Sequence, residues 1–244
     1  MTYCVGIKLD LGLVLASDSR TNAGVDHIAT FRKMTVFENP GERVIVLLAS
    51  GNLAVTQSVV NTLRERSKQE AVQSHILNAP TMFAAAELVG LALREVQARD
   101  GPFLQQRHIE ATASFIVGGQ IAGEDQRLFT IYNEGNFIEA TPDTPYFQIG
   151  EIKYGKPIID RVVTSHTSLM EAAKCVLISF DSTMRSNISV GLPIDLMVYE
   201  KDSLRAGIHR RIKEHDPYFE MIHRQWGEGL KKVFAQLPPP HWSD

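Results

Sequence analysis

The sequence contains few cysteines, and this narrows the kinds of protein it can encode. Only two of its 244 residues are cysteine, Cys4 and Cys175, and they lie far apart in the chain. We therefore expect no disulfide framework, and we expect the protein to lie in the reducing cytoplasm. Cys4 lies in a strand-like pattern and Cys175 in a helical one, where each is expected to be a small buried side chain rather than a nucleophile.

The chain also lacks an excess of charge and a long apolar run. Its net charge of −3 provides neither the basic surface that nucleic acids need nor a lysine-rich face for a membrane. No apolar run approaches the roughly 20 residues of a membrane span. The first residues show no positive segment, apolar stretch or cleavage site, so no signal peptide is expected. We expect neither nucleic acid nor a membrane as a partner.

Several common catalytic signatures are missing. The eight histidines form no H-E-x-x-H motif and no His/Cys pair at metal-ligand spacing, so no catalytic metal is predicted. Neither G-x-S-x-G nor G-x-x-x-x-G-K-[ST] occurs, which argues against a serine-hydrolase elbow and a phosphate-binding loop. No cofactor is predicted. His215 and His223 are expected on a helix surface or in contacts with a partner.

No repeat, low-complexity tract or linker divides the chain. With 44% hydrophobic residues it can bury the core of one large domain or two small ones. We predict a single domain over residues 1–244, in which 238–244 form a short tail because three consecutive prolines stop a helix. Trp226 and Trp242 near this end are candidates for partner contacts, and Trp226 is equally a candidate for the core.

Strands are predicted in several hairpin-like groups. Residues 2–9 and 13–18 flank a turn and predict a hairpin at the start of the chain. Two more strands surround the Asn-Pro-Gly turn of residues 39–41, and the second is apolar throughout, so both of its faces are expected to be covered. The remaining predicted strands lie in 110–119, 126–133, 136–142, 145–150, 190–203 and 206–212.

Four helices are predicted between these groups. They run from a serine or asparagine cap at 50–52 to about 69, from 81 to a stop at 100–102, over 168–185, and from about 217 to 237. Strands outnumber helices and pair as hairpins, while the helices come in separate groups. This order predicts an α+β fold with two packed antiparallel sheets and helices outside each, a four-layer αββα sandwich. Strict β-α alternation, typical of a doubly wound parallel sheet, is absent.

Thr2 is the first candidate for chemistry. An aminopeptidase normally removes an initiator Met that precedes a small residue, which would leave Thr2 at the chain start. A free α-amine has a pKa of about 7.7–8.0, so one residue would supply both a hydroxyl nucleophile and its base. Alternatively, Thr2 is an ordinary second residue, as in many cytosolic proteins. Thr2 alone favours this second interpretation.

Three further residues favour the catalytic interpretation. Asp18 ends the second predicted strand, Lys33 begins the third, and Gly51 lies at a strand-to-helix junction. An ammonium near the threonine hydroxyl would lower the pKa of that hydroxyl, and a carboxylate would keep the ammonium charged. A glycine N–H at a helix start can donate to an oxyanion. The structural alternatives are a turn-bonding Asp18, a solvated Lys33 and a helix-start Gly51.

These stretches resemble a known family. T-x-x-V-G-I at 2–7, G-L-V-L-A-S-D-S-R at 12–20, K-M at 33–34 and S-G-N-L-A at 50–54 resemble proteasome β-type subunits, and in particular Anbu, the bacterial ancestral β-subunit group. The resemblance runs through the whole chain and is most specific over residues 2–55. It implies the N-terminal-nucleophile αββα fold, with Thr2 as nucleophile, Lys33 beside it, Asp18 holding the lysine and Gly51 as oxyanion donor.

The later part of the chain departs from the family pattern. Proteasome-like subunits carry a Gly-Ser-Gly loop, and here Gly150-Glu151-Ile152 stands in its place. Glu151 either orients the terminal amine or is a surface carboxylate. The family also carries an Asp-x-x-Ser-Gly element after its third helix. Here Asp181 is the candidate acid, and either Ser186 or Ser189 is the candidate serine.

The resemblance implies a homo-oligomeric threonine peptidase or amidohydrolase that acts on peptide or amide bonds. Proteasome-like subunits form rings, and Anbu-type proteins are associated with arc-like or spiral assemblies. Two alternatives remain open from the sequence: a scaffold subunit with little activity, and an amidase for small substrates. An unfoldase partner is not identified by the sequence.

Overall fold

The computed structural model describes residues 2–22, 28–69 and 72–241. One five-stranded antiparallel sheet contains the first strands of the chain in its middle. Its order is β10 (Tyr146–Gly150), β1 (Tyr3–Leu9), β2 (Gly12–Asp18), β11 (Ile194–Glu200) and β12 (Ile208–Ile212). The predicted N-terminal hairpin is confirmed, because β1 and β2 pair from Cys4 with Ser17 to Leu9 with Gly12.

The second antiparallel sheet also has five strands, which follow the chain order. They are β5 (Met34–Asn39), β6 (Arg43–Gly51), β7 (Ala113–Ile121), β8 (Arg127–Ile131) and β9 (Phe137–Glu139). Strand β6, which lies between β5 and β7, is buried from Arg43 to Ser50, as its unbroken apolar run predicts. A separate hairpin of β3 (Arg20–Asn22) and β4 (Ile28–Thr30) extends from β2.

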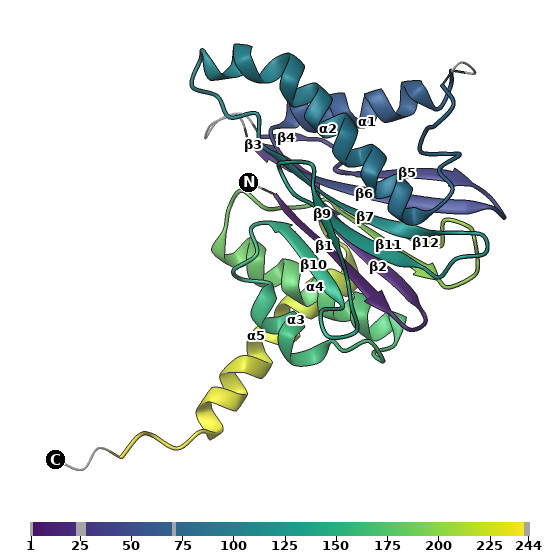
Figure 1. Ribbon diagram of the computed structural model, residues 1–244. Helices are drawn as coiled ribbons and strands as arrows, with labels where there is room; N and C mark the ends of the chain where they lie inside the picture. Colours follow the sequence, from purple (N-terminus) through teal and green to yellow (C-terminus); the bar gives the residue numbers. More distant parts are fainter. Residues whose placement is uncertain (1, 23–27, 70–71, 242–244) are drawn as a thin grey trace.

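The two sheets pack face to face (Figure 1). Successive side chains of a strand point to opposite faces, so alternate residues of β1, β2 and β6 fill the space between the sheets. This inner layer includes Cys4, Leu13, Leu15, Val46 and Leu48, all buried. The residues between them, such as Val5 and Ile7, point outward and are covered by helices.

Helices cover both outer faces (Figure 1). The second sheet is covered by α1 (Leu53–Arg66) and α2 (Met82–Gln105). The first sheet is covered by α3 (Lys156–Val162), α4 (Leu169–Ser186) and the first half of α5 (Pro217–Gln236). The predicted αββα sandwich is therefore confirmed. Asn52 is the residue that caps α1, with its side chain accepting from the N–H groups of Ala54 and Val55.

Two features of the helices differ from the prediction. The predicted stop of α2 at 100–102 is wrong, because the helix continues through Pro102 to Gln105. Proline removes one helical hydrogen bond, but only one further turn follows it, so little of the ladder is lost. The short helix α3 was not predicted, since its seven residues are too few to show a clear helical period.

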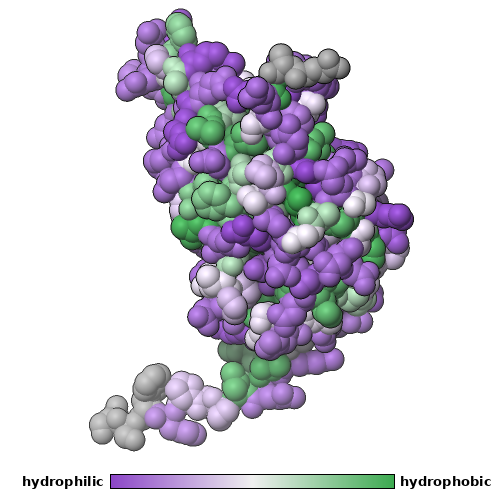
Figure 2. Space-filling view, turned by 45° about the vertical axis from the view of Figure 1, so that its right-hand side comes forward, coloured by the Kyte–Doolittle hydropathy of each residue, from purple (hydrophilic) through white to green (hydrophobic). Residues whose placement is uncertain are grey.

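The last helix leaves the body of the molecule. Its first half packs on α4 through Phe219 and Ile222, whereas its second half projects outward (Figure 1). Figure 2 shows a mainly polar surface with scattered apolar side chains and a group of them where this segment leaves the body. Trp226 is half-buried beside α4, and Trp242 lies outside the described residues. Among the residues that the structure describes, no helix is both long enough and apolar enough to cross a membrane.

Candidate active site

Thr2 is held in place at the start of β1. Although it stands next to the end of the chain, it is only 8% exposed. Its carbonyl oxygen accepts from the Glu151 N–H at 2.7 Å, and the next residue, Tyr3, donates its N–H to Asp18 Oδ1 at 3.0 Å. Chain ends usually fray unless such contacts restrain them. The Thr2–Tyr3 peptide is therefore fixed on both sides, by β10 and by the end of β2.

Asp18 and Lys33 form a buried ion pair beside this peptide. Lys33 Nζ lies 2.7 Å from Asp18 Oδ1, the oxygen that also accepts the Tyr3 N–H. The Lys33 side chain is 6% exposed and the Asp18 side chain 0%. A second bond runs from Lys33 Nζ to the Arg20 carbonyl oxygen at 2.6 Å. One carboxylate oxygen thus links the ammonium directly to the backbone that carries Thr2.

The electrostatics of the pair follow from its burial. Desolvation raises the pKa of the Asp18 carboxyl, while the Lys33 ammonium and the Tyr3 N–H act in the opposite direction. Acidification therefore protonates this carboxyl at a higher pH than it would a free aspartate. An ammonium has three N–H donors, and two are used by Asp18 and Arg20. Among the described residues, the third has no hydrogen-bond partner.

Gly51 ends β6 directly before the cap of α1. Its φ of +115° lies in the region that favours glycine, and a Cβ there would come within 2.3 Å of the Thr112 carbonyl oxygen. Backbone geometry therefore requires glycine at this position, independently of any role in catalysis. The residue is exposed. The strand-to-helix junction predicted at Gly51 is confirmed.

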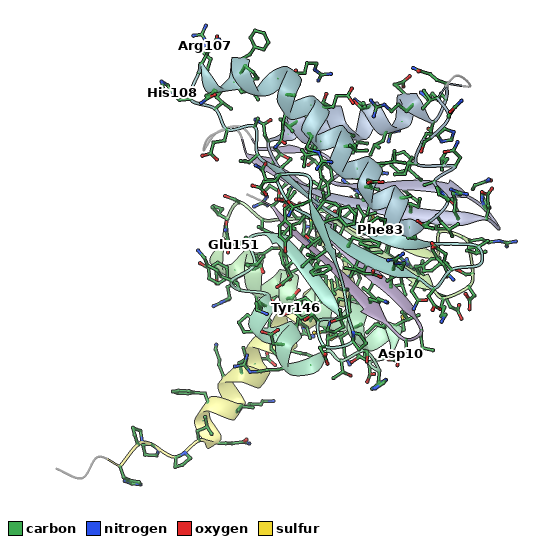
Figure 3. The ribbon with its side chains drawn as sticks, in the orientation of Figure 1. Asp10, Phe83, Arg107, His108, Tyr146 and Glu151 are labelled. Carbon is green, nitrogen blue, oxygen red and sulfur yellow. The ribbon has the colours of Figure 1, made fainter. Side chains whose placement is uncertain are left out.

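Glu151 follows β10 and faces the same end of the sandwich as the start of β1 (Figures 1 and 3). Its side chain is buried, and its Oε2 accepts from Asn187 Nδ2 at 2.9 Å. The neighbouring Gly150 has a φ of +85°, and a Cβ there would come within 1.9 Å of the Thr2 carbonyl oxygen. The surface interpretation of Glu151 is wrong, because its side chain is buried and its carboxylate is bonded to Asn187.

Comparison with known proteins identifies the family. A family model described as "Proteasome subunit" matches residues 2–198. A structure of Anbu (ancestral beta-subunit) from Yersinia bercovieri is 54% identical and has a TM-score of 0.92, covering 99% of this chain and 100% of that one. The chain belongs to the Anbu group of the proteasome subunit family. The resemblance seen in the sequence is thus confirmed.

Two further relatives agree with this assignment. A structure described as the helical assembly of the Anbu complex from Pseudomonas aeruginosa is 52% identical, with a TM-score of 0.93 and 98% coverage of both chains. Proteasome subunit beta 2 of Nitrosopumilus maritimus is 27% identical over 206 residues, which cover 84% of this chain and 88% of that protein.

Asn187 also lies at the site, although it was not predicted from the sequence. Asn187 ends α4 and is 9% exposed. The signal that was missed is the register of the Asp-x-x-Ser-Gly element. If the element is aligned on Gly191 instead of on Asp181, Asn187 stands at the position of the acid and Val190 at that of the serine. The loop after α4 is anchored nearby, since Arg20 Nη1 donates to the Ile188 carbonyl at 3.0 Å and Ser19 Oγ to that of Pro193 at 2.5 Å.

The hydroxyl groups of the two candidate serines make no hydrogen bond to Thr2, Asp18 or Lys33 among the described residues. Ser186 is exposed, and Ser189 is half-buried and donates its backbone N–H to Asn187 Oδ1 at 2.9 Å. Within the described part of the chain, no contact of these hydroxyls supports the predicted role of either serine in assisting the nucleophile.

Among the described residues, the Asp181 side chain contacts the last helix and not the residues around Thr2. Its carboxylate Oδ1 lies 2.6 Å from His223 Nδ1, so it joins α4 to α5. A cavity of about 530 Å³ between these helices is lined by both residues and by Trp226. The structure therefore brings together Thr2, Asp18, Lys33, Glu151 and Asn187, and it leaves Asp181 outside. The described residues contain no group of three His, Cys, Asp or Glu side chains placed to hold a metal ion.

Proposed function

We propose that this protein is an N-terminal threonine hydrolase that cleaves peptide or related amide bonds, with Thr2 as nucleophile once Met1 has been removed. The observation that carries the proposal is the buried Asp18–Lys33 pair, whose shared oxygen also holds the Tyr3 N–H. A purely structural chain end does not need a buried ammonium next to it, because burying a charge costs free energy. The pair fits a role in lowering the pKa of the Thr2 hydroxyl.

The mechanism uses few groups. Thr2 Oγ1 attacks the substrate carbonyl carbon, and its proton passes to the Thr2 α-amine, directly or through one water. The Gly51 N–H donates to the oxygen that becomes negative in the tetrahedral intermediate. The carbon–nitrogen bond then breaks, the leaving amine takes the proton, and an ester to Thr2 remains. Water hydrolyses this ester with the amine again as base.

The proposal also covers the assembly, the location and the domain organisation of the protein. The helical assembly of the Pseudomonas aeruginosa Anbu complex supports self-association of this chain into a ring, an arc or a spiral. We place it in the cytoplasm, as one domain over residues 1–244. Asp181, Ser186 and Ser189 have no step in this mechanism, whereas Glu151 and Asn187 position the start of the chain.

Labelling tests the proposal directly. The native assembly, purified from its own host, is incubated with a threonine-directed β-lactone and analysed by intact mass and peptide mapping. We expect a chain that lacks Met1 and carries one adduct on Thr2, and no adduct on a Thr2→Ala variant with unchanged assembly. Retention of Met1, or an unmodified Thr2, would overturn the proposal and favour a scaffold subunit.

A further inference from the structure

A groove that is lined in part by Lys33 could contact a substrate. It lies between α1 and the edge strand β5 and has a volume of about 580 Å³. Its inner end contains Lys33 and Ala49, which are joined by a hydrogen bond from the Ala49 N–H to the Lys33 carbonyl at 2.9 Å. Ala49 also accepts a weak bond from Cys4 Sγ in β1, at 3.6 Å. The groove therefore opens next to the residues that surround Thr2.

The charges along this groove have one sign. Arg32, Lys33 and Arg64 are among its lining residues, and no Asp or Glu is among them. Lys33 is neutralised by Asp18. Arg64 donates to the neutral amide oxygen Asn61 Oδ1 at 3.3 Å, and its neighbour Glu65 pairs with Lys68 instead. Arg64 thus keeps a positive charge that no carboxylate of the described residues pairs with.

The rest of the lining suits a side chain with an apolar stem and a polar end. One face of α1 contributes residues at helical spacing, with Leu53 and Val60 apolar and Thr56 and Gln57 polar, and Met34 of β5 lies opposite. An arginine guanidinium binds a carboxylate more strongly than a neutral amide, because the hydrogen bond is charge-assisted. The groove therefore matches a glutamate side chain better than a glutamine side chain of nearly the same shape.

We propose that this groove receives the substrate side chain next to the scissile bond, on its acyl side, and selects an acidic one through Arg32 and Arg64. The inference rests on the proposed function, since the groove acts on specificity only if Thr2 attacks the neighbouring carbonyl. Arg32 and Arg64 are specificity residues in this account and take no part in the chemistry.

Matched peptides test the selection by charge. Fluorogenic peptides that differ only in Glu, Gln, Leu or Arg before the cleaved bond are compared by kcat/KM on the native assembly. We expect kcat/KM for the Glu peptide to exceed that for the Gln peptide by up to about fivefold. This ratio should fall towards one in Arg64→Gln and Arg32→Gln. Arg64→Glu should favour the Arg peptide. The control Arg66→Gln removes a charge from the same helix, at a residue that pairs with Glu95 outside the groove, and should keep the ratio.

Binding separates this inference from the proposed function. On the uncleaving Thr2→Ala assembly, fluorescence anisotropy of the labelled Glu and Gln peptides should show the same preference. If no peptide is cleaved but Glu binds more tightly than Gln through Arg64, the groove is a binding site for an acidic side chain, and the hydrolase proposal falls together with the placement of that side chain next to a scissile bond. If cleavage is efficient with a Glu-to-Gln ratio of one or below, or with a ratio that Arg64→Gln and Arg32→Gln leave unchanged, the inference is overturned and the hydrolase proposal stands.

Discussion

Two pairs in this molecule, each of an aspartate carboxylate with a side-chain nitrogen, have nearly the same length and very different surroundings. Asp18 and Lys33 lie 2.7 Å apart with side chains 0% and 6% exposed. Asp181 and His223 lie 2.6 Å apart, but the His223 side chain is 60% exposed. The first pair connects two strands at the start of the chain, and the second connects α4 with the last helix. Distance alone does not separate the pair proposed to act in catalysis from a packing contact.

Burial and further partners do separate them. Lys33 has a second partner in the Arg20 carbonyl, and Asp18 has one in the Tyr3 N–H. Because both side chains are buried, each of these contacts acts at a lower dielectric than in water and holds the charges in one geometry. The His223 pair is open to solvent, where water and salt screen it. Variants at both pairs, and at the contact of Glu151 with Asn187, test this contrast.

Loss of the Lys33 charge should have the largest effect. In Lys33→Met the acylation of Thr2 by a β-lactone is expected to slow by about 10³-fold, the range reported for a lost electrostatic contact at a reacting oxygen. The free energy of unfolding should fall by about 3 kcal/mol, because Asp18 is left buried and unpaired. Labelling rates and urea unfolding measure the two effects. Lys68→Met, at an exposed pair on α1, should change neither.

A double variant distinguishes catalysis from stability at this pair. Lys33→Met with Asp18→Asn removes both charges and keeps an acceptor for the Tyr3 N–H. Stability should largely return, because no unpaired charge is buried. Labelling should stay slow. Acylation at the wild-type rate in the stable double variant would mean that the pair only holds the fold.

Removal of the Glu151 carboxylate should have an intermediate effect, visible in the pH dependence of the rate at which the β-lactone labels Thr2. If this carboxylate lies near the Thr2 ammonium, it favours the charged form and raises the pKa of that amine. The amine must be neutral to act as base, so Glu151→Gln should move the acid limb of the labelling rate to lower pH, by about 1 unit. Glutamine keeps an acceptor for Asn187. A rate profile that does not move would leave Glu151 with a structural role alone.

Asn187→Ala is the matched control for this shift. It breaks the bond to Glu151 Oε2 and leaves the carboxylate charged. The acid limb should then keep its position or move less than in Glu151→Gln, while the rate falls because the loop after α4 is less restrained. An equal shift in both variants would trace the effect to loop position instead of charge.

The contrast between the pairs also explains what the sequence could predict. Asp18 and Gly51 end strands whose alternation is clear, and Lys33 directly precedes one, so the sequence could place each at a strand end. The packing of the first sheet on the second then brings Asp18 to Lys33. Asn187 and Glu151 lie in loops, where no period fixes which residue faces inward. Asp181 is one of the buried residues of α4, and only the position of α5 shows that His223 is its partner.

The Asp181–His223 pair should have the smallest effect. Asp181→Asn keeps an oxygen that can accept from His223, and the pair is exposed on one side, so the free energy of unfolding should change by less than about 1 kcal/mol. The labelling rate of Thr2 should equal that of the wild type at every pH, because no contact of the described residues joins this pair to Lys33. Urea unfolding and labelling on the same preparation measure both quantities. A tenfold loss of labelling in a variant with unchanged stability would show that exposure does not separate the two pairs, and it would restore Asp181 to the catalytic group.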